Sequence, residues 1–359
     1  MKVLTVVGAR PQFIKAAPVS RLLRRSHDEF LVHTGQHYDD AMSDLFFRQL
    51  DMPSPDVNLG VGSGPHGAQT AAMLEGIEGL AIEQRPELLL TYGDTNSTLA
   101  GALAGAKLHI PIAHVEAGLR SYDRRMPEEV NRVVTDHLSD LLLCPTGVAA
   151  TNLEREGITR GVHVVGDVMF DAFRENLERA RTTCTILNDL ALDPRSFVLL
   201  TVHRAENVDD PRVLESIIRG TADAGCAVIF PVHPRTRKAL EDGRIEGGRN
   251  LRLIEPVGYL EMLVLEDAAE AIVTDSGGVQ KEAYFAGRPA VTLRETTEWT
   301  ETVAAGWNML VGTDPRAIAA AIQTFRPRGP RPELFGDGHA AARIVERMTG
   351  NNMGAHWTR

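Results

Sequence analysis

Cysteine is scarce in this sequence, which has only three in 359 residues. They stand far apart, at Cys144, Cys184 and Cys226, and none has another cysteine or a histidine at the spacing of a metal ligand. Because the number is odd and the spacing fits no ligand pattern, the sequence predicts neither a disulfide framework nor a zinc site. Such cysteine usage is typical of a reducing compartment, and we expect a cytoplasmic protein.

Long apolar runs and an excess of basic residues are missing as well. No run approaches the ~18 apolar residues of a membrane-spanning helix, so we expect no membrane partner. The first predicted strand begins at Lys2, without the basic, apolar and small-residue pattern of a leader. Acidic residues outnumber basic ones by 48 to 38, and this net charge of -10 argues against a nucleic-acid partner, whose phosphates need a clustered basic surface.

The remaining composition is that of an ordinary folded protein, with 43% hydrophobic and 24% charged residues. At roughly 150 residues per domain, the length predicts two domains. Short apolar runs alternate with amphipathic stretches, which is the pattern of strand and helix units that build a parallel sheet. These runs lie at residues 3–7, 30–33, 88–92, 111–115, 141–144 and 162–165, and again at 197–202, 227–231, 251–254, 271–274, 289–293 and 309–311.

The two sets of runs predict an α/β protein with two doubly wound, Rossmann-like domains facing a cleft. The first domain is expected at residues 1–166 and the second at 167–338, and a C-terminal helix at about 339–359 could pack back on the first domain. In doubly wound sheets, ligands bind outside the carboxyl ends of the strands. Residues that follow the strands are therefore the candidates for a functional site.

Three carboxylates in the first half follow a strand or begin a helix. Glu116 follows a predicted strand in the segment PIAHVEAGLR, Asp94 follows another in YGDTNS, and Glu128 begins a helix in MPEEVNR. Moving a proton between the two faces of a carbon, or assisting a leaving group, requires an acid and a base, so these residues predict proton transfer. Two alternatives stay open: Thr95 and Ser97 as helix caps, and the acids as Mg²⁺ ligands, although no short ligand motif is present.

Two strand, turn and helix segments predict sites for an anion. In VGARPQFIK, Arg10 lies in the turn and Lys15 in the helix, and two cations near one strand end suit a diphosphate. In IVTDSGGVQKEA, Ser276 and the two glycines after it open a helix, whose unpaired N–H groups attract an anion. Glu282, roughly one turn into that helix, could accept hydrogen bonds from ribose hydroxyls. A simple capped helix start is the alternative.

Three loop segments carry further candidates. In TVHRAEN, His203 and Arg204 follow the first strand of the second half, a position that favours a functional histidine over a structural one. In HTGQHYDD, the glycine predicts a turn, so Gln36 and His37 are expected to contact a ligand rather than zinc. In RETTEWTETV, Trp299 is either packed in a surface turn or in contact with the ligand, and the sequence leaves both open.

Together these motifs make the chain similar to the non-hydrolysing UDP-N-acetylglucosamine 2-epimerases. The resemblance runs from Lys2 to about Met348, and it rests on GARP, GDT, HVEAGLR, PEE, HR and TDSGG in their family order. Each motif alone is weak, but the set is highly specific. The resemblance implies the two-domain glycosyltransferase B-type fold, and we expect a homodimer.

The resemblance implies reversible epimerisation at C2 of UDP-GlcNAc, giving UDP-ManNAc. Because the C2 proton is not acidic, the family eliminates UDP to leave a 2-acetamidoglucal and then adds UDP back with protonation of the opposite face. By matching motifs, the implied catalytic residues are Asp94, Glu116, Glu128 and His203, and the implied substrate-binding residues are Arg10, Lys15, Gln36, His37, Arg120, Arg204, Ser276, Gly277, Gly278 and Glu282. The UDP-sugar is the expected partner, and no metal or redox cofactor is implied. Which carboxylate is the base in which direction stays open.

Two segments depart from the family pattern. Gln36 and His37 are followed by Tyr38 and Asp39, where members with a second, allosteric UDP-GlcNAc site carry Arg and then Gln, so that site stays open. The segment TEWTE at residues 297–301 replaces a common TERPE. A similar Trp version resembles members that act on UDP-2,3-diacetamido uronic acid sugars as well as some that act on UDP-GlcNAc, so the exact sugar stays open, with the diacetamido uronic acid as an alternative substrate. A hydrolysing 2-epimerase and a B-type glycosyltransferase are further alternatives, whereas a catalytically silent UDP-sugar sensor would not need three acids.

Overall fold

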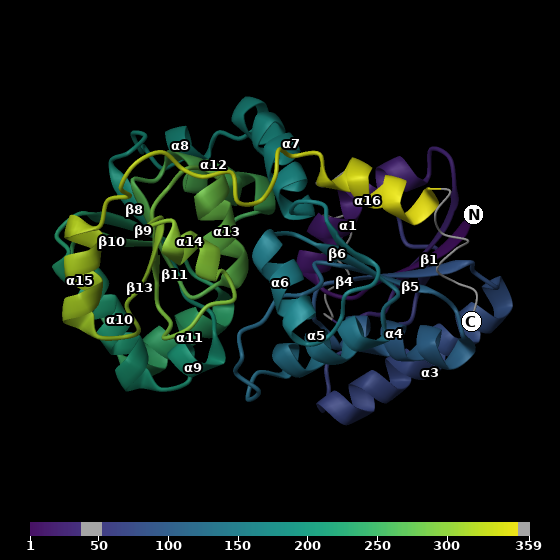
Figure 1. Cartoon of the computed structure of the whole chain (residues 1–359). Helices are drawn as coiled ribbons and strands as arrows, with labels where there is room; N and C mark the ends of the chain where they lie inside the picture. Colours follow the sequence, from purple (N-terminus) through teal and green to yellow (C-terminus); the bar gives the residue numbers. More distant parts are fainter. Residues whose placement is uncertain (37–51, 351–359) are drawn as a thin grey trace. The chain divides into compact units, whose positions relative to one another are not determined.

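The computed structural model describes residues 1–36 and 52–350 and contains two compact units (Figure 1). The first unit combines Met1–Arg174 with the C-terminal segment that begins at Phe335, and the second spans Glu175–Leu334. The chain therefore enters the second unit inside helix α7 (Val168–Thr183), rather than after residue 166 as expected from the sequence. It returns to the first unit a few residues before the end expected for the second domain, at residue 338.

Within the described residues, the first unit is built on a seven-stranded parallel sheet in the order β3-β2-β1-β4-β5-β6-β7. The strands are β1 (Lys2–Val7), β2 (Asp28–His33), β3 (Val57–Asn58), β4 (Leu88–Tyr92), β5 (Ile112–Val115), β6 (Leu141–Cys144) and β7 (Val162–Val164). The sequence missed β3, because two residues are too few to show an apolar pattern. The strand order reverses between the neighbours β1 and β4, so their carboxyl ends form the switch point where ligands bind such folds.

Helices flank this sheet and position its strand ends (Figure 1). They are α1 (Arg10–Leu23), α3 (His66–Gln84), α4 (Asn96–Leu108), α5 (Pro127–Leu138), α6 (Gly147–Arg155), the first part of α7, and α16 (Ala340–Thr349). Helix α5 begins at Pro127, where a missing N–H is harmless and the fixed φ suits a helix. Helix α16, drawn in yellow, packs against α1, so the C-terminal helix belongs to the first unit.

The second unit repeats the plan with a described six-stranded parallel sheet in the order β10-β9-β8-β11-β12-β13. Its strands are β8 (Phe197–Thr201), β9 (Ala227–Pro231), β10 (Leu251–Ile254), β11 (Ala271–Thr274), β12 (Ala290–Thr292) and β13 (Asn308–Leu310). Its helices are α8 (Ile186–Asp189), α9 (Ala205–Val208), α10 (Pro211–Asp223), α11 (Pro234–Gly243), α12 (Tyr259–Ala268), α13 (Gly277–Phe285), α14 (Thr300–Ala304) and α15 (Pro315–Thr324). The switch point of this sheet lies between β8 and β11.

The central strands are buried on both faces, which explains why they read as continuous apolar runs. Every residue of β4 and of β8 is buried. In the first unit, Leu4 of β1 belongs to one core with Met73 and Ile77 of α3. These sheets confirm the predicted α/β class with two doubly wound, Rossmann-like parts. Among helices of the described ranges, none combines the length and the apolar character needed to cross a bilayer.

Candidate active site

The turn between β1 and α1 packs tightly at the switch point of the first unit. Gly8 leaves no room for a side chain, because a Cβ there would lie 2.0 Å from Ser97 Oγ and 2.2 Å from Thr34 Oγ1. Gln12 Oε1 accepts hydrogen bonds from the backbone N–H groups of Gly8 (2.8 Å) and Ala9 (3.0 Å). The protein itself therefore uses these two donors in the turn before α1.

Lys15 of α1 and Glu116, which follows β5, form a buried ion pair at this switch point. Glu116 has a φ of 75°, a left-handed conformation that is uncommon for a residue other than glycine and that clusters at functional sites. Gly93, after β4, has a φ of 64°, and a Cβ there would lie 3.3 Å from Lys15 Nζ and 3.4 Å from Glu116 Oε2. The ion pair thus lies directly against the turn that carries Asp94, whereas Arg10 is exposed at the first residue of α1.

Asp94 is half-buried and is held by α5. Its carboxylate pairs with Arg132, and its backbone carbonyl accepts a hydrogen bond of 3.0 Å from Asn131 Nδ2. The neighbouring Thr95 caps α4, as the alternative reading of that segment predicted. Arg132 and Asn131 were not predicted as site residues. Their spacing was the available signal, because residues three and four positions after Glu128 share its face of a helix.

The two acids at the start of α5 have different surroundings. Glu129 is buried; it accepts backbone hydrogen bonds of 2.9 Å from Ser121 and 2.9 Å from Tyr122, and it pairs with Arg132 at 3.0 Å. Glu128 is exposed in the first helical turn. Glu129 therefore fixes the loop that precedes the helix, while Glu128 is accessible to a ligand.

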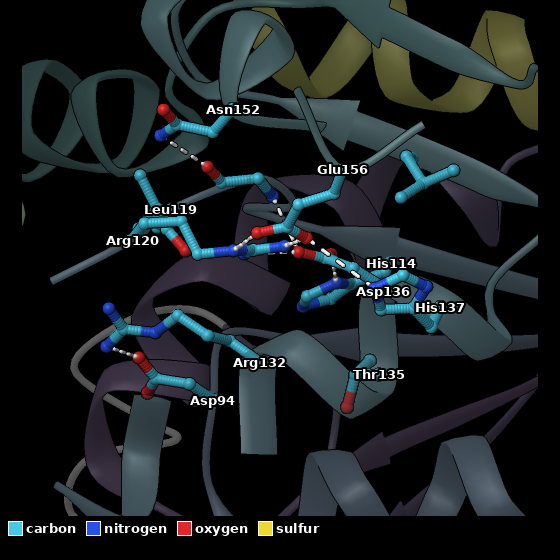
Figure 2. A network of polar contacts seen from close by, with 12 residues as sticks. Asp94, His114, Leu119, Arg120, Arg132, Thr135, Asp136, His137, Asn152 and Glu156 are labelled. Atoms are coloured by element: carbon cyan, nitrogen blue, oxygen red, sulfur yellow. Dashed lines mark hydrogen bonds and ion pairs between the residues drawn. The ribbon is translucent and has the colours of Figure 1, made fainter. Parts of the chain in front are cut away.

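Arg120 lies in a network with the buried residues His114 and Asp136 and with the exposed Glu156 (Figure 2). Its NH1 donates to Asp136 Oδ2 at 2.7 Å, and its Nε and NH2 donate to the two oxygens of Glu156, each at 2.7 Å. His114 lies 2.7 Å from Asp136 through Nδ1 and 2.7 Å from the Gly93 carbonyl through Nε2. This arrangement favours a structural role for Arg120, where the sequence predicted a substrate contact.

The contacts in this network keep the Asp136 carboxylate and the Arg120 guanidinium ionised. Burial alone would raise the pKa of Asp136, but hydrogen bonds and charges from His114 and Arg120 outweigh it and hold that pKa below its ordinary value. Burial alone would lower the pKa of Arg120, but Glu156 and Asp136 outweigh it and raise that pKa. For Cys144 of β6, burial, assisted by the charge of Asp136, raises the pKa to about 12. The thiol is therefore an inert part of the core.

The predicted Gln36 and His37 loop is only partly described. Gln36 is half-buried, and its Oε1 accepts hydrogen bonds from Ser97 Oγ at 2.7 Å and Ser97 N at 3.2 Å. This contact places Gln36 beside the start of α4, next to the Gly8 turn. His37 lies outside the described residues.

In the second unit, Asp275 organises the loop that follows β8. Its buried carboxylate accepts backbone hydrogen bonds from His203 (3.1 Å) and Arg204 (3.0 Å) and one from Asn207 Nδ2 (3.1 Å). The His203 ring is half-exposed, with Nδ1 3.3 Å from Asp275 Oδ1. His233, which caps α11, has a pKa lowered by burial and then by the charges of His203 and Arg235. Asp275 belongs to the TDSGG motif, but no role was predicted for it from the sequence.

The start of α13 is capped by Ser276, as the alternative reading of this segment predicted. The Ser276 Oγ faces Val279 N at 3.5 Å. A Cβ at Gly277 would lie 2.2 Å from Glu298 Oε1, and Glu298 pairs with the buried Arg294 at 3.0 Å. A carboxylate thus lies against the positive end of the helix, which shows that this end accommodates an anionic group. Gly278 follows in the first turn and is half-buried, and Glu282, one turn further on, is buried.

Trp299 is packed rather than exposed. Its ring is 3% exposed, and Lys281 Nζ lies 4.2 Å from its centroid, in the geometry of a cation–π contact. The structure therefore favours the packed alternative for this residue.

In the described residues, no group of three or more His, Cys, Asp or Glu side chains is arranged to hold a metal ion. The geometry gives no support to the Mg²⁺ alternative for the carboxylates.

The chain was compared with known protein families and with individual relatives. The family model for UDP-N-acetylglucosamine 2-epimerase matches residues 21–349. A UDP-N-acetylglucosamine 2-epimerase homolog of Methanococcus maripaludis is 53% identical over 96% of this chain and 99% of its own length. The UDP-2,3-diacetamido-2,3-dideoxy-D-glucuronate 2-epimerase of Pseudomonas aeruginosa is 47% identical over 97% of this chain and 99% of its own.

Solved structures agree in fold over the same length. The crystal structure of Methanocaldococcus jannaschii UDP-GlcNAc 2-epimerase, determined with UDP-GlcNAc and UDP, has a TM-score of 0.90 and 43% identity, covering 97% of this chain and 99% of its own. The Neisseria meningitidis UDP-GlcNAc 2-epimerase bound to UDP-GlcNAc has a TM-score of 0.88 and 31% identity over 98% of this chain and 100% of its own. The predicted glycosyltransferase B-type fold is confirmed, and the chain belongs to the UDP-N-acetylglucosamine 2-epimerase family.

Proposed function

We propose that this protein interconverts UDP-GlcNAc and UDP-ManNAc without net hydrolysis. The observation that carries this function is the cluster at the first switch point, where the buried Lys15 and Glu116 pair lies against the Gly93 turn and Asp94 is fixed by Arg132. Two carboxylates with two cations at the ends of the neighbouring strands β4 and β5 suit proton transfer beside a diphosphate. The 2-epimerase relatives support the same reaction.

The proposed reaction is an elimination followed by an addition. A carboxylate takes the proton from C2, the electron pair forms the C1=C2 bond, and the C1–O bond to the diphosphate breaks to release UDP and 2-acetamidoglucal. Addition of UDP with protonation of the opposite face of C2 gives the other epimer. We assign these proton transfers, and the support they need, to Asp94, Glu116 and Glu128. These steps are redox-neutral, so they call for no redox cofactor.

We propose UDP contacts for each unit separately. In the first unit, Arg10 and Lys15 supply positive charge near the end of β1. In the second unit, the start of α13 with Ser276, Gly277 and Gly278 would receive phosphate oxygens, which requires Glu298 to move from the helix end. We further assign His203 to the diphosphate or the departing oxygen, because its ring is half-exposed at the second switch point.

The remaining candidates are Arg204, Gln36, His37 and Glu282. Arg204 precedes α9, and its backbone N–H, like that of His203, donates to Asp275, so we assign Arg204 to the diphosphate. We assign Glu282 to the ribose hydroxyls, and Gln36 and His37 to the sugar side of the site. We also propose that the protein is cytoplasmic and forms a homodimer. Sedimentation analysis of the purified protein would test the homodimer.

A second candidate substrate is a UDP-2,3-diacetamido uronic acid. The observation in its favour is the 47% identity to the Pseudomonas aeruginosa enzyme, which is named for such a sugar. The choice between the two substrates depends on groups at C3 and C6 of the sugar, whereas the elimination itself is the same chemistry at C1 and C2.

The decisive experiment is incubation with UDP-GlcNAc in D₂O without added metal, followed by proton NMR of the sugar. UDP-ManNAc with deuterium at C2 and no free ManNAc is the expected result. Free ManNAc with UDP would instead identify a hydrolysing 2-epimerase. Unchanged UDP-GlcNAc, together with turnover of the diacetamido uronic acid analogue, would establish the second candidate, and no turnover of either would refute the function.

A further inference from the structure

His114 is a fully buried residue of β5 that none of the proposed reaction steps uses. Its two ring nitrogens each face an oxygen at 2.7 Å, Asp136 Oδ1 on one side and the Gly93 carbonyl on the other. We propose that His114 is a positioning residue, which holds the Gly93–Asp94 turn as a doubly protonated imidazolium with Asp136 as its counter-ion.

The hydrogen-bond partners set the protonation state of His114. The Gly93 carbonyl can only accept, so the contact with Nε2 requires an N–H there. Asp136 also accepts from Gly118 N (3.1 Å) and Arg120 NH1 (2.7 Å), which is the pattern of an ionised carboxylate, so Nδ1 must donate to it as well. A neutral imidazole has one N–H and would turn a lone pair toward one of these oxygens. Only the imidazolium satisfies both contacts.

The charged groups around His114 come from several elements. Asp136 of α5 and Glu156, which follows α6, are negative, and Arg120 is positive. Asp136 is buried and its carboxylate faces both His114 and Arg120, whereas Glu156 is exposed and its charge is solvated. The other titratable groups of the network are Cys144, which is neutral, and His137, whose exposed ring lies 3.6 Å from Glu156.

The contacts of His114 lead to both catalytic turns. Through the Gly93 carbonyl, it fixes the peptide immediately before Asp94, whose own carbonyl and carboxylate are held from α5. Through Asp136, it is connected to Gly118 N, two residues after Glu116. One imidazolium and one carboxylate therefore fix the spacing of the two turns that carry Asp94 and Glu116, two of the carboxylates proposed for proton transfer. A displacement of about 1 Å at such groups can cost ~100-fold in rate.

Two amide variants separate the contacts of His114. The amide of glutamine reaches the position of Nε2 and can still donate to the Gly93 carbonyl, whereas the amide of asparagine reaches only the position of Nδ1 and Asp136. Because the catalytic consequence rests on the proposed epimerase function, kcat and KM are measured with whichever UDP-sugar the wild type turns over. We expect His114→Asn to lower kcat by about 10- to 100-fold with little change in KM, and His114→Gln to lose far less.

Thermal unfolding of both variants provides the structural control. Each removes one buried partner and the charge, so we expect similar melting temperatures despite different kcat values. Equal kcat losses that follow stability, or a wild-type kcat in His114→Asn, would overturn the positioning role.

The protonation state is tested on the wild type without any activity assay. In protein labelled with ¹⁵N-histidine, we expect the His114 ring to show two protonated nitrogens at neutral pH. The His114 resonance is identified by its absence from the spectrum of a folded His114 variant, or from contacts of the His114 ring protons with Gly93. One nitrogen with the shift of an unprotonated imidazole would refute the proposal. A wild type inactive on every UDP-sugar tested would refute the proposed function instead and leave this spectrum as the test of His114.

Discussion

Replacement of Gly93 by alanine should lower turnover by more than the accompanying loss of folding stability can explain. Gly93 has a φ of 64°, a left-handed conformation that costs an L-residue about 1–2 kcal/mol. The new Cβ would lie 3.3 Å from Lys15 Nζ and 3.4 Å from Glu116 Oε2, closer than an ordinary contact of about 3.5–4.0 Å between heavy atoms. The ion pair must therefore shift by a few tenths of an ångström, or the turn that carries Asp94 must move away from it.

Gly60 offers a matched control in the same unit. Its φ is 60°, but a Cβ there would have no heavy atom within 4 Å. Gly60→Ala and Gly93→Ala should therefore each lose about 1–2 kcal/mol of unfolding free energy from the backbone term. Only Gly93→Ala should also lose turnover, by about tenfold or more, because Glu116, one of the carboxylates proposed for proton transfer, and its partner Lys15 are displaced.

The assay combines urea unfolding with the NMR measurement of epimerisation. The unfolding curves give the loss of unfolding free energy for each variant. The kcat values are compared without denaturant, at a temperature where both variants are folded. A Gly93→Ala enzyme that turns over as fast as Gly60→Ala would refute the argument that the Lys15 and Glu116 pair depends on the space above Gly93.

Three further predictions address other parts of the site. Asp94→Asn and Glu116→Gln should each lower kcat by about 100-fold or more while UDP still binds in titration calorimetry; near-normal rates in both would remove the acid–base assignment. Gly277→Ala should weaken UDP binding by about tenfold, or ~1.4 kcal/mol, because its Cβ would lie 2.2 Å from the present position of Glu298 Oε1, the space that a phosphate oxygen would take over; an unchanged Kd would contradict this. The folded-state pKa of Asp136 is lowered, so its ionised form stabilises the fold above the unfolded pKa, and this stabilisation is lost as pH falls through the folded-state value. In urea unfolding below about pH 4, wild type should therefore lose stability more steeply than Asp136→Asn, and equal slopes would argue against the charged pair.

Local patterns in the sequence were sufficient for the architecture. A strand buried on both faces must be apolar throughout, so β4 and β8 are visible as runs without any knowledge of their neighbours. The same holds for Glu116 and Asp94, because a polar residue directly after such a run lies at the carboxyl edge of the sheet. The strand β3 escaped prediction, since its two residues join the sheet only through pairing with β2.

The roles of individual polar residues depended on partners far along the chain. Lys15 reads as one more helix cation, yet it meets Glu116 across 101 positions. Arg120 belongs to the HVEAGLR motif and suggested a substrate contact, but Asp136 and Glu156, 16 and 36 positions away, occupy its guanidinium. No local pattern specifies such pairs, because they form only when separate strands and helices bring their side chains together.

The sequence alone therefore determined the family, the α/β class and the positions of the acids on strand ends, because these depend on periodicity and on motifs within a few residues. The tertiary structure alone decided that Glu129 fixes a loop while Glu128 is accessible, and that His114 lies between Asp136 and the Gly93 carbonyl. These outcomes depend on burial and on which acceptor faces each donor, and both arise only when the sheet and its helices pack.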